Sequence, residues 1–269
     1  MQKFWTLTLF SLLVIGLVSF GLVSCGKRSE QTSVDTTQHV EIIPAPESKY
    51  PDVKLTIVSP REGQELKDVK DSVLVVMQVS GTELGVHTDN DSTKGIAYSK
   101  QGQHVHVIVD DKPYMANYKN GQPFNIGVLT PGMHTLRAFP SFSWHESIKS
   151  PGAFATRTFY VGTATHTNSA NNLSGPLLTY SRPKGEYSVA DAAKVLLDFY
   201  ISNAELGPNS YKVRPWIDGK QLQDITKWQA YYITGLGPGT HNIKLQLIAP
   251  DGSVVPGPYN SPSTEITIK

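Results

Sequence analysis

The sequence predicts an all-β protein built from two tandem β-sandwich domains. Short strands rich in β-branched and aromatic residues alternate with turn residues, and only one short stretch has helical character. Five segments also recur in the same order in the two halves of the chain. About a hundred residues of short strands without helix are typical of a sandwich. The chain has 269 residues, which is enough for two such domains.

The chain opens with an apolar run from about Leu7 to Val23, which follows Lys3 and contains no acidic residue. This composition is typical of a targeting segment. The run ends in Leu22-Val23-Ser24-Cys25, and Cys25 is the only cysteine of the chain. The tetrapeptide resembles the bacterial lipobox, which implies a signal peptide at residues 1–25 and lipidation of Cys25. The alternatives are an N-terminal membrane anchor, for which the run is short, or a secretory peptide cleaved elsewhere.

The lipobox resemblance implies an extracytoplasmic protein held at a membrane by acyl chains on Cys25. Gly26 follows the cysteine in place of an aspartate, which favours the outer membrane if the source is Gram-negative. No further cysteine remains for a disulfide, so the stability of the fold must come from its core. Residues 26–50 are polar and rich in Ser, Thr, Glu and Pro, and we expect them to form a flexible tether.

The charges of the chain are nearly balanced, with 24 Lys and Arg residues against 23 Asp and Glu residues. Because the signal peptide contains Lys3 and no acidic residue, its removal makes the two numbers equal. This balance argues against a broad basic surface for nucleic acid or for a membrane. We therefore expect no nucleic-acid partner.

The recurring segments divide the folded part into two copies of one unit. The pairs are Leu55–Arg61 with Leu178–Lys184, Val76–Gly85 with Asp198–Gly207, Val107–Pro113 with Pro215–Gln221, Leu129–Leu136 with Leu236–Ile243, and Ser150–Phe154 with Val255–Tyr259. They place one domain at residues 51–164 and the other at 176–269, with a polar linker at 165–175. The pattern resembles the Ig-like and fibronectin-like modules of bacterial surface proteins, a likeness that implies a fold and names no ligand.

The elements follow from residue type along each copy. In the first copy we expect strands at residues 73–79, 104–109 and 134–139, with turns at Pro-, Gly- and Asp-containing stretches between them. In the second copy a short helical turn is expected at Val189–Lys194. The first copy also carries an insertion between Gly85 and His104. Loops added to a rigid sandwich are common sites of binding.

The stretch His104-Val105-His106 begins the strand at residues 104–109. Because strand side chains alternate between faces, His104, His106 and Ile108 share one face, and the neighbouring valines share the other. Same-face neighbours lie about 7 Å apart, near enough for two imidazoles to hold one metal ion. In the second copy the two histidines correspond to Lys212 and Arg214, so we expect the histidine face to meet solvent.

The alternative is a metal site built on His104 and His106. A zinc or copper ion usually requires three or four ligands. His87 in the insertion and His145 in the segment Ser141–Ser147 are candidate further ligands, since loops can reach over the outer face of a strand.

Two other histidines occupy equivalent positions in the copies. His134 and His241 each stand at the start of a strand, on the same side as its core residues. Because both copies have this histidine and only one has the pair at His104 and His106, we expect His134 and His241 to be structural, with the imidazole bonded to turn backbone.

The residues Trp144, Glu146, Tyr114 and Tyr118 form a candidate binding surface for a peptide or sugar. No nucleophile with an assignable base was found, so we expect no enzymatic activity. The sequence therefore predicts a non-catalytic binding or scaffold module of the cell envelope, with an envelope protein or glycan as its partner. The alternative function is binding of copper or zinc through His104 and His106.

Overall fold

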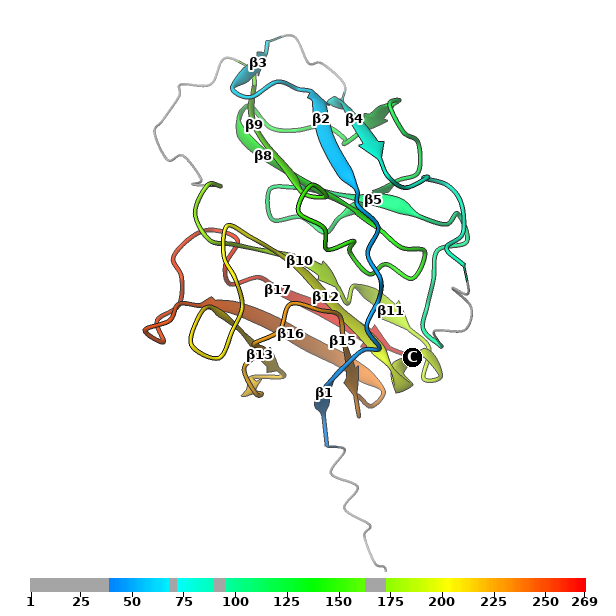
Figure 1. The fold of residues 1–269 in the computed structure, drawn as a ribbon, viewed down its shortest axis with the longest axis vertical. Coiled ribbons are helices and arrows are strands. Elements are labelled where there is room, and N and C mark those ends of the chain that lie inside the picture. Colours follow the sequence, from blue (N-terminus) through cyan, green and yellow to red (C-terminus); the bar gives the residue numbers. More distant parts are fainter. Residues whose placement is uncertain (1–38, 68–71, 90–94, 163–172) are drawn as a thin grey trace, which may run out of the picture. The chain divides into compact units, whose positions relative to one another are not determined.

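The fold is taken from a computed structural model, which describes residues 39–67, 72–89, 95–162 and 173–269 (Figure 1). The expected signal peptide, with Cys25, lies outside these residues, as does most of the expected linker. The structure confirms the predicted all-β class, with two β-sandwich domains in tandem. Among the described residues, no helix is both long and apolar enough to cross a membrane.

The regular elements of the described residues are strands, apart from one short 3-10 helix. The elements are β1 (Glu41–Pro44), β2 (Lys54–Ser59), β3 (Gln64–Leu66), β4 (Leu74–Ser80), β5 (His104–Val109), β6 (Met115–Asn117), β7 (Pro123–Asn125), β8 (Gly132–Ser141), β9 (Ala155–Val161), β10 (Leu177–Arg182), β11 (Gly185–Tyr187), a 3-10 helix η2 (Asp191–Ala193), β12 (Val195–Ser202), β13 (Lys212–Ile217), β14 (Lys220–Gln221), β15 (Tyr231–Thr234), β16 (Gly239–Ile248) and β17 (Ser263–Ile268). The short helix η2 lies within the stretch where a helical turn is expected.

Both domains have the same strand order. In the first domain, a sheet β2-β4-β7 faces a sheet β3-β9-β8-β5-β6. In the second, β10-β12-β15 faces β11-β17-β16-β13-β14. Each domain also has one parallel pair at the equivalent place, β3 with β9 and β11 with β17. This is the two-sheet arrangement of an immunoglobulin-like sandwich, and the strand-by-strand match supports a duplicated unit.

Alternation of apolar residues builds each core. In β4, Val75, Met77 and Val79 are buried and the residues between them are more exposed. The inner residues of β12 and β16, such as Phe199 and Leu245, form the second core. Burying one such side chain stabilises the fold by about 1.5–3 kcal/mol relative to leaving it exposed.

The strand β1 corrects the prediction of a flexible tether over residues 26–50 in its described part, residues 39–50. Glu41–Pro44 pairs antiparallel with β15 and extends a sheet of the second domain. Just after it, the Ala45 N–H donates to the Ala230 carbonyl at 3.0 Å. Composition alone missed this segment because the short apolar stretch at Ile42 and Ile43 gains its stability from pairing with a distant edge strand.

The two domains contact each other through outer faces of their sheets, with β10 and β12 of the second domain against β5 and β8 of the first (Figure 1). Phe139 of β8 stacks on Tyr200 of β12 with ring centroids 5.4 Å apart. Beside this apolar contact, Lys149 donates to Asp198 at 2.6 Å, and both side chains are almost fully buried. We call this contact the interdomain interface.

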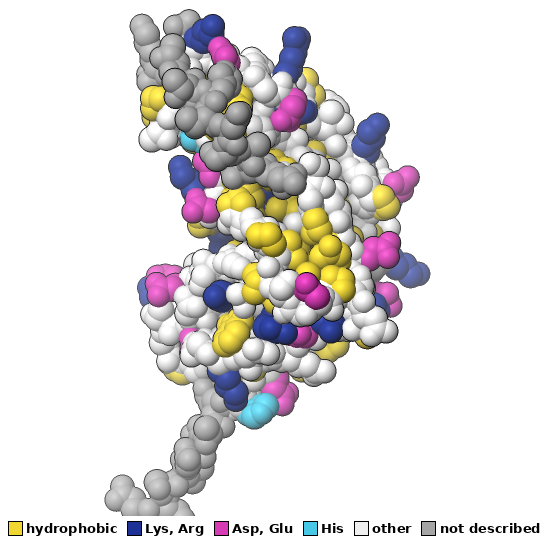
Figure 2. Space-filling model, turned by 90° about the vertical axis from the view of Figure 1, so that its left-hand side faces the viewer, with side chains coloured by type: hydrophobic (Ala, Val, Ile, Leu, Met, Phe, Trp, Pro, Cys, Tyr) yellow, Lys and Arg dark blue, Asp and Glu magenta, His cyan; other side chains and the backbone are white. Residues whose placement is uncertain are grey.

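One face of the molecule shows Lys and Arg side chains interspersed with Asp and Glu side chains (Figure 2). This distribution agrees with the nearly balanced composition of the chain. On that face, the described residues form no broad patch of a single charge.

Candidate metal centre

The strand β5 is buried on both of its faces. Its six residues are all buried, whereas β13, its equivalent in the second domain, alternates between half-buried and buried residues. The half-buried positions of β13 include Lys212 and Arg214, in line with a largely solvated outer face. The expectation that His104 and His106 also meet solvent is therefore wrong: both side chains are 0% exposed.

The physical reason is the interdomain interface. The alternation of side chains along the strand is as expected: Val105, Val107 and Val109 belong to the first core. The two histidines do not, and they lie on the opposite face of β5. The second domain covers that outer face: Ser181 of β10 lies 3.0 Å from His106 Nδ1. A sequence comparison of two copies cannot reveal that one copy packs on the other.

Aromatic rings cover the rest of the histidine pair. Tyr114 stacks on His106, with ring centroids 3.6 Å apart and an interplanar angle of 6°. Tyr118 lies 4.9 Å from the His104 ring. Both tyrosines come from the segment that follows β5, so the hairpin folds back over its own outer face. Together with the second domain, these tyrosines leave His104 and His106 with no exposed surface.

His145 joins this pair from the loop between β8 and β9. The loop turns tightly, with the His145 N–H donating to the Phe142 carbonyl at 2.9 Å. His145 has a φ of 71°, in the left-handed region that residues other than glycine rarely adopt. This conformation directs a half-buried imidazole toward His104, with ring centroids 5.0 Å apart.

The three imidazoles bring one nitrogen each to a common point. The ligand atoms of His104, His106 and His145 all lie within 4.8 Å of one another. The distance from His104 Nε2 is 3.0 Å to His106 Nε2 and 3.2 Å to His145 Nδ1. With metal–nitrogen bonds of about 2.0–2.1 Å and a tetrahedral angle, ligand nitrogens lie about 3.3 Å apart. The two distances from His104 Nε2 are close to that value, and the remaining pair of ligand nitrogens, on His106 and His145, lies within 4.8 Å.

The remaining nitrogens of the buried pair have partners that set their protonation. His104 Nδ1 donates to the Gly102 carbonyl at 2.8 Å, which leaves Nε2 with a lone pair. His106 Nδ1 lies beside the Ser181 hydroxyl, which can donate or accept and so tolerates either tautomer. Metal-binding histidines commonly have such a second partner, which fixes the ring.

Burial keeps these imidazoles neutral. It lowers the pKa of His104 to about 4 and shifts the pKa of His106 well below its ordinary value. Burial likewise lowers the pKa of His145, and the positive charge of Arg182 adds to the effect. A metal ion therefore competes with few protons for the nitrogens near neutral pH.

His145 is the half-buried member of the cluster and borders the surface. A small surface pocket of about 10 Å³ is lined by His145, Trp144, Arg182 and Lys194, among others. This volume corresponds to about one water molecule.

His87, the other candidate ligand, is not part of the cluster. It is exposed, and its Nε2 lies 3.0 Å from the Lys100 carbonyl within the insertion. The insertion nevertheless holds the loop of His145 in place. The Thr88 N–H donates to Ser143 Oγ at 2.8 Å, and the Ser99 N–H donates to the Ser143 carbonyl at 2.7 Å.

The candidate binding surface for a peptide or sugar does not exist as an exposed patch. Trp144 is 4% exposed, stacks on Phe142 and donates to Glu146 at 2.7 Å. Glu146 is also buried and accepts from Ser48 and Tyr50 of the N-terminal segment. Tyr114 is buried beside His106, and Tyr118 is half-buried. The aromatic residues of these loops pack inward because the insertion and the N-terminal segment cover them.

His134 and His241 form matching hydrogen bonds in the two domains. His134 Nδ1 donates to Asp110 at 2.8 Å, and Nε2 donates to the Thr130 carbonyl at 2.8 Å. His241 contacts Asp218 and the Gly237 carbonyl in the same way. Each imidazole thus meets two acceptors, which requires the doubly protonated form and leaves no nitrogen for a metal.

Sequence reasoning missed the contributions of Ser181 and Tyr114 to the histidine cluster. A usable signal was present on the same face: Ile108 and Phe139 are apolar residues at positions expected to meet solvent. Both belong to the apolar cluster at the interdomain interface. Large apolar residues on an outer face indicate that something covers it.

No protein-family model matches the sequence, and no curated protein matches it significantly. Similar solved structures include the fibronectin(III)-like modules of CbhA from Clostridium thermocellum, at 16% identity and a TM-score of 0.27, covering 80% of this chain and 94% of that one. SGBP-B of the mixed-linkage glucan utilization locus of Bacteroides ovatus, in complex with a mixed-linkage heptasaccharide, is 13% identical at a TM-score of 0.24, covering 80% and 47%. The S-layer protein SbsC domains 4 and 5 are 8% identical at a TM-score of 0.20, covering 82% and 99%. The fold assignment therefore rests on the strand order.

Proposed function

We propose that this chain is a lipid-anchored, extracytoplasmic metal-binding protein that holds one copper or zinc ion at His104, His106 and His145. The observation that carries the proposal is the convergence of one nitrogen from each imidazole within 4.8 Å. The lipid anchor at Cys25 and the location outside the cytoplasm remain predictions from the lipobox resemblance. We assign a binding role and no catalytic step to the site.

The ligand set favours metals that prefer imidazole. Neutral imidazole suits zinc, copper, iron and nickel, and three histidines leave room for one further ligand. Neither a carboxylate nor a thiolate joins the cluster of described residues. Calcium and magnesium are therefore disfavoured, because they require oxygen ligands.

Nearby positive charge favours copper over zinc. Arg182 and Lys184 lie close enough to lower the pKa of His104, although burial is the larger cause. Each of these cations repels Zn²⁺ about twice as strongly as it repels Cu⁺, because the Coulomb energy scales with the charge of the ion. A singly charged copper ion at three imidazoles minimises this repulsion, so we expect Cu⁺ to be the preferred ion.

Metal titration of the full-length chain in detergent tests the proposal. Cu⁺ binding is measured in competition with a chromophoric chelator, and Zn²⁺ binding is measured by calorimetry. We expect the chain to bind one equivalent of copper. Loss of a hydrogen-bond partner of a metal ligand typically lowers metal affinity about 10–100-fold. Loss of a ligand itself should cost more, so we expect His145→Ala to lower copper affinity about 100-fold or more. His145 is half-buried, which makes this substitution less disruptive than one at His106.

The matched control is His87→Ala, which removes an exposed histidine that the cluster does not include. We expect this variant to bind copper as the unmodified chain does. If neither metal binds at one equivalent, or if His145→Ala binds as well as His87→Ala, the metal function is wrong and a scaffold or binding module without a metal remains.

A further inference from the structure

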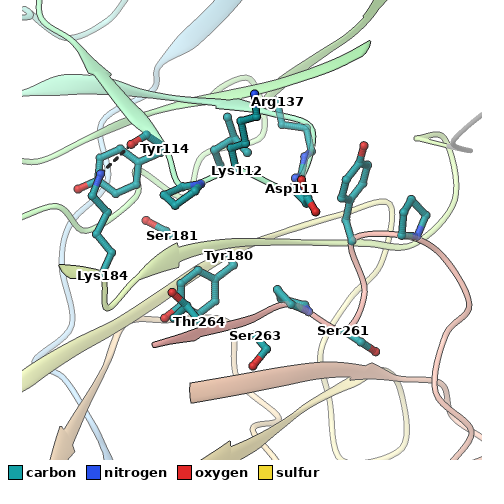
Figure 3. Close-up of a pocket in the computed structure, with 15 residues that line it drawn as sticks. Asp111, Lys112, Tyr114, Arg137, Tyr180, Ser181, Lys184, Ser261, Ser263 and Thr264 are labelled. Carbon is teal, nitrogen blue, oxygen red and sulfur yellow. Dashed lines mark hydrogen bonds between the residues drawn. The ribbon is translucent and has the colours of Figure 1, made fainter. Parts of the chain in front are cut away.

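A cavity of about 290 Å³ lies at the interdomain interface, next to the histidine cluster (Figure 3). The turn after β5 lines it from the first domain, and residues around Tyr180 and the segment before β17 line it from the second. Figure 3 shows Lys112 and Arg137 on one wall, with Tyr180, Ser263 and Thr264 on the opposite wall. Its volume is at the lower end of the range for small-molecule sites.

The lining of this cavity is positively charged. Lys112, Arg137 and Lys184 are its cationic residues and Asp111 is its acidic residue, a net charge of +2. The opposite wall adds hydroxyl groups, including those of Ser263 and Thr264. Hydroxyl and cationic groups together supply the donors that recognise an oxyanion.

Arg137 is the central residue of this lining, because it is a buried cation that forms no ion pair with a carboxylate among the described residues. It is 4% exposed. Its guanidinium donates to the Asp110 carbonyl and to the Thr179 hydroxyl, and it lies 3.8 Å from the Tyr259 ring centroid. Its Nε has no hydrogen-bond partner among the described residues. Burial lowers the pKa of Arg137 to about 10, so the side chain is still charged at neutral pH. The carboxylates of Asp110 and Asp111 favour its charged form without forming an ion pair, and an anion in the cavity would further offset the cost of burying this charge.

Lys184 likewise forms no ion pair with a carboxylate in the part of the chain that the structure describes. Its Nζ donates to the Tyr114 carbonyl at 2.7 Å and lies 3.9 Å from the Tyr114 ring centroid. Lys112 stands at the exposed rim of the cavity. A ligand entering from solvent thus meets Lys112 before it reaches the buried guanidinium of Arg137.

We propose that this cavity binds a small oxyanion, a phosphate or a carboxylate, with Arg137 as the buried counter-charge and Lys112 at the entrance. The proposal goes beyond metal binding and does not require it, because none of the three histidines lines the cavity. Tyr114 and Ser181 lie between the two sites: both line the cavity, and both contact His106.

The test uses the metal-free full-length chain in detergent with a metal chelator present. Inorganic phosphate and succinate are titrated in separate calorimetric experiments, which distinguishes the two kinds of oxyanion. We expect saturable one-to-one binding of at least one probe that weakens as salt is raised, since the contact is electrostatic.

Lys112 and Lys220 occupy equivalent positions in the two domains and provide a matched pair of variants. Lys112→Gln should weaken binding about tenfold, the typical effect of losing a hydrogen bond to a charged group. The control is Lys220→Gln at the equivalent position of the second domain, which does not line the cavity and should leave binding unchanged. Arg137→Gln should abolish binding, and its circular dichroism spectrum must match that of the unmodified chain.

The proposal is overturned if neither phosphate nor succinate binds saturably at concentrations up to about 10 mM, a weak affinity for any specific site. Equal effects of Lys112→Gln and Lys220→Gln would also overturn it, because they would indicate general attraction to a cationic surface. Loss of copper binding with retained anion binding would refute the metal centre alone, so the two proposals fail separately.

Discussion

Replacing Asp198 by alanine should destabilise the interdomain interface more than any exposed charge change can. Asp198 is 0% exposed and accepts from Lys149 Nζ at 2.6 Å, from Ser147 Oγ at 3.1 Å and from the Ser147 N–H at 3.1 Å. Lys149 comes from the loop of the first domain, so the ion pair joins the two domains. Replacing Asp198 leaves the buried ammonium of Lys149 without a counter-charge.

The expected loss is about 3–5 kcal/mol, the usual effect of breaking a buried ion pair from one side. This is a large part of the about 5–15 kcal/mol that stabilises a typical native protein. With a urea m-value of about 2 kcal/mol/M, the unfolding midpoint should fall by about 2 M. The same loss should not follow from replacing both charges by apolar residues, because no buried charge then remains unpaired.

Urea unfolding of the full-length chain, followed by tryptophan fluorescence, measures this loss. The control is Asp224→Ala, which breaks the partly exposed ion pair with Arg214 at 2.8 Å. This pair is bidentate and its side chains are 25% and 23% exposed, so its loss should cost about 1 kcal/mol, well below the loss expected for the buried pair. The double variant Asp198→Leu with Lys149→Met should recover most of the stability. Equal midpoints for Asp198→Ala and Asp224→Ala would refute the reasoning.

Two further predictions concern pH and packing. The hydrogen bond to Asp110 raises the pKa of His134, so the stability that this imidazolium contributes is present at pH 5.5 and is lost as pH rises through the raised pKa. His134→Gln should therefore cost about 1–2 kcal/mol more at pH 5.5 than at pH 9 in urea unfolding, and a pH-independent cost would contradict the doubly protonated form. Phe139→Ala should cost about 3–5 kcal/mol, because Phe139 is 0% exposed at the interdomain interface. Val58→Ala, on a side chain 52% exposed, should change stability by less than about 0.5 kcal/mol, and similar losses in both variants would contradict the assigned packing.

The fold class could be predicted because its signals are local and repeated. The alternation of apolar residues in β4 and the turn residues after β5 depend on a few neighbours along the chain. The repeat added information that one copy alone lacks, since five weak matches in one order are stronger than any of them. The strand β1 was not predicted, because its stability comes from pairing with β15, nearly two hundred residues away.

The candidate site was only half predictable for a related reason. Residue type and strand parity selected His104 and His106, and loop reach selected His87 and His145 as further ligands, of which only His145 joins the cluster. Parity also places both histidines on the outer face of the first sandwich, but exposure depends on what lies beyond that face. Ser181 and Tyr200, which cover it, belong to the other domain and carry no mark of this role in the sequence.

The equivalent strands β5 and β13 lie in different surroundings in the two domains. In the second domain the outer face of β13 bears Lys212, Arg214 and Trp216, all half-buried, and Arg214 pairs with Asp224 near the surface. In the first domain the equivalent positions are His104, His106 and Ile108, which are apolar or neutral when unprotonated and so can be buried without a large desolvation cost. Neutral imidazoles at the positions that carry long cationic residues in the second domain are thus compatible with docking, and the docked domain removes the imidazoles from water. The second sandwich therefore encloses the histidine cluster, although it supplies none of the three candidate ligand nitrogens.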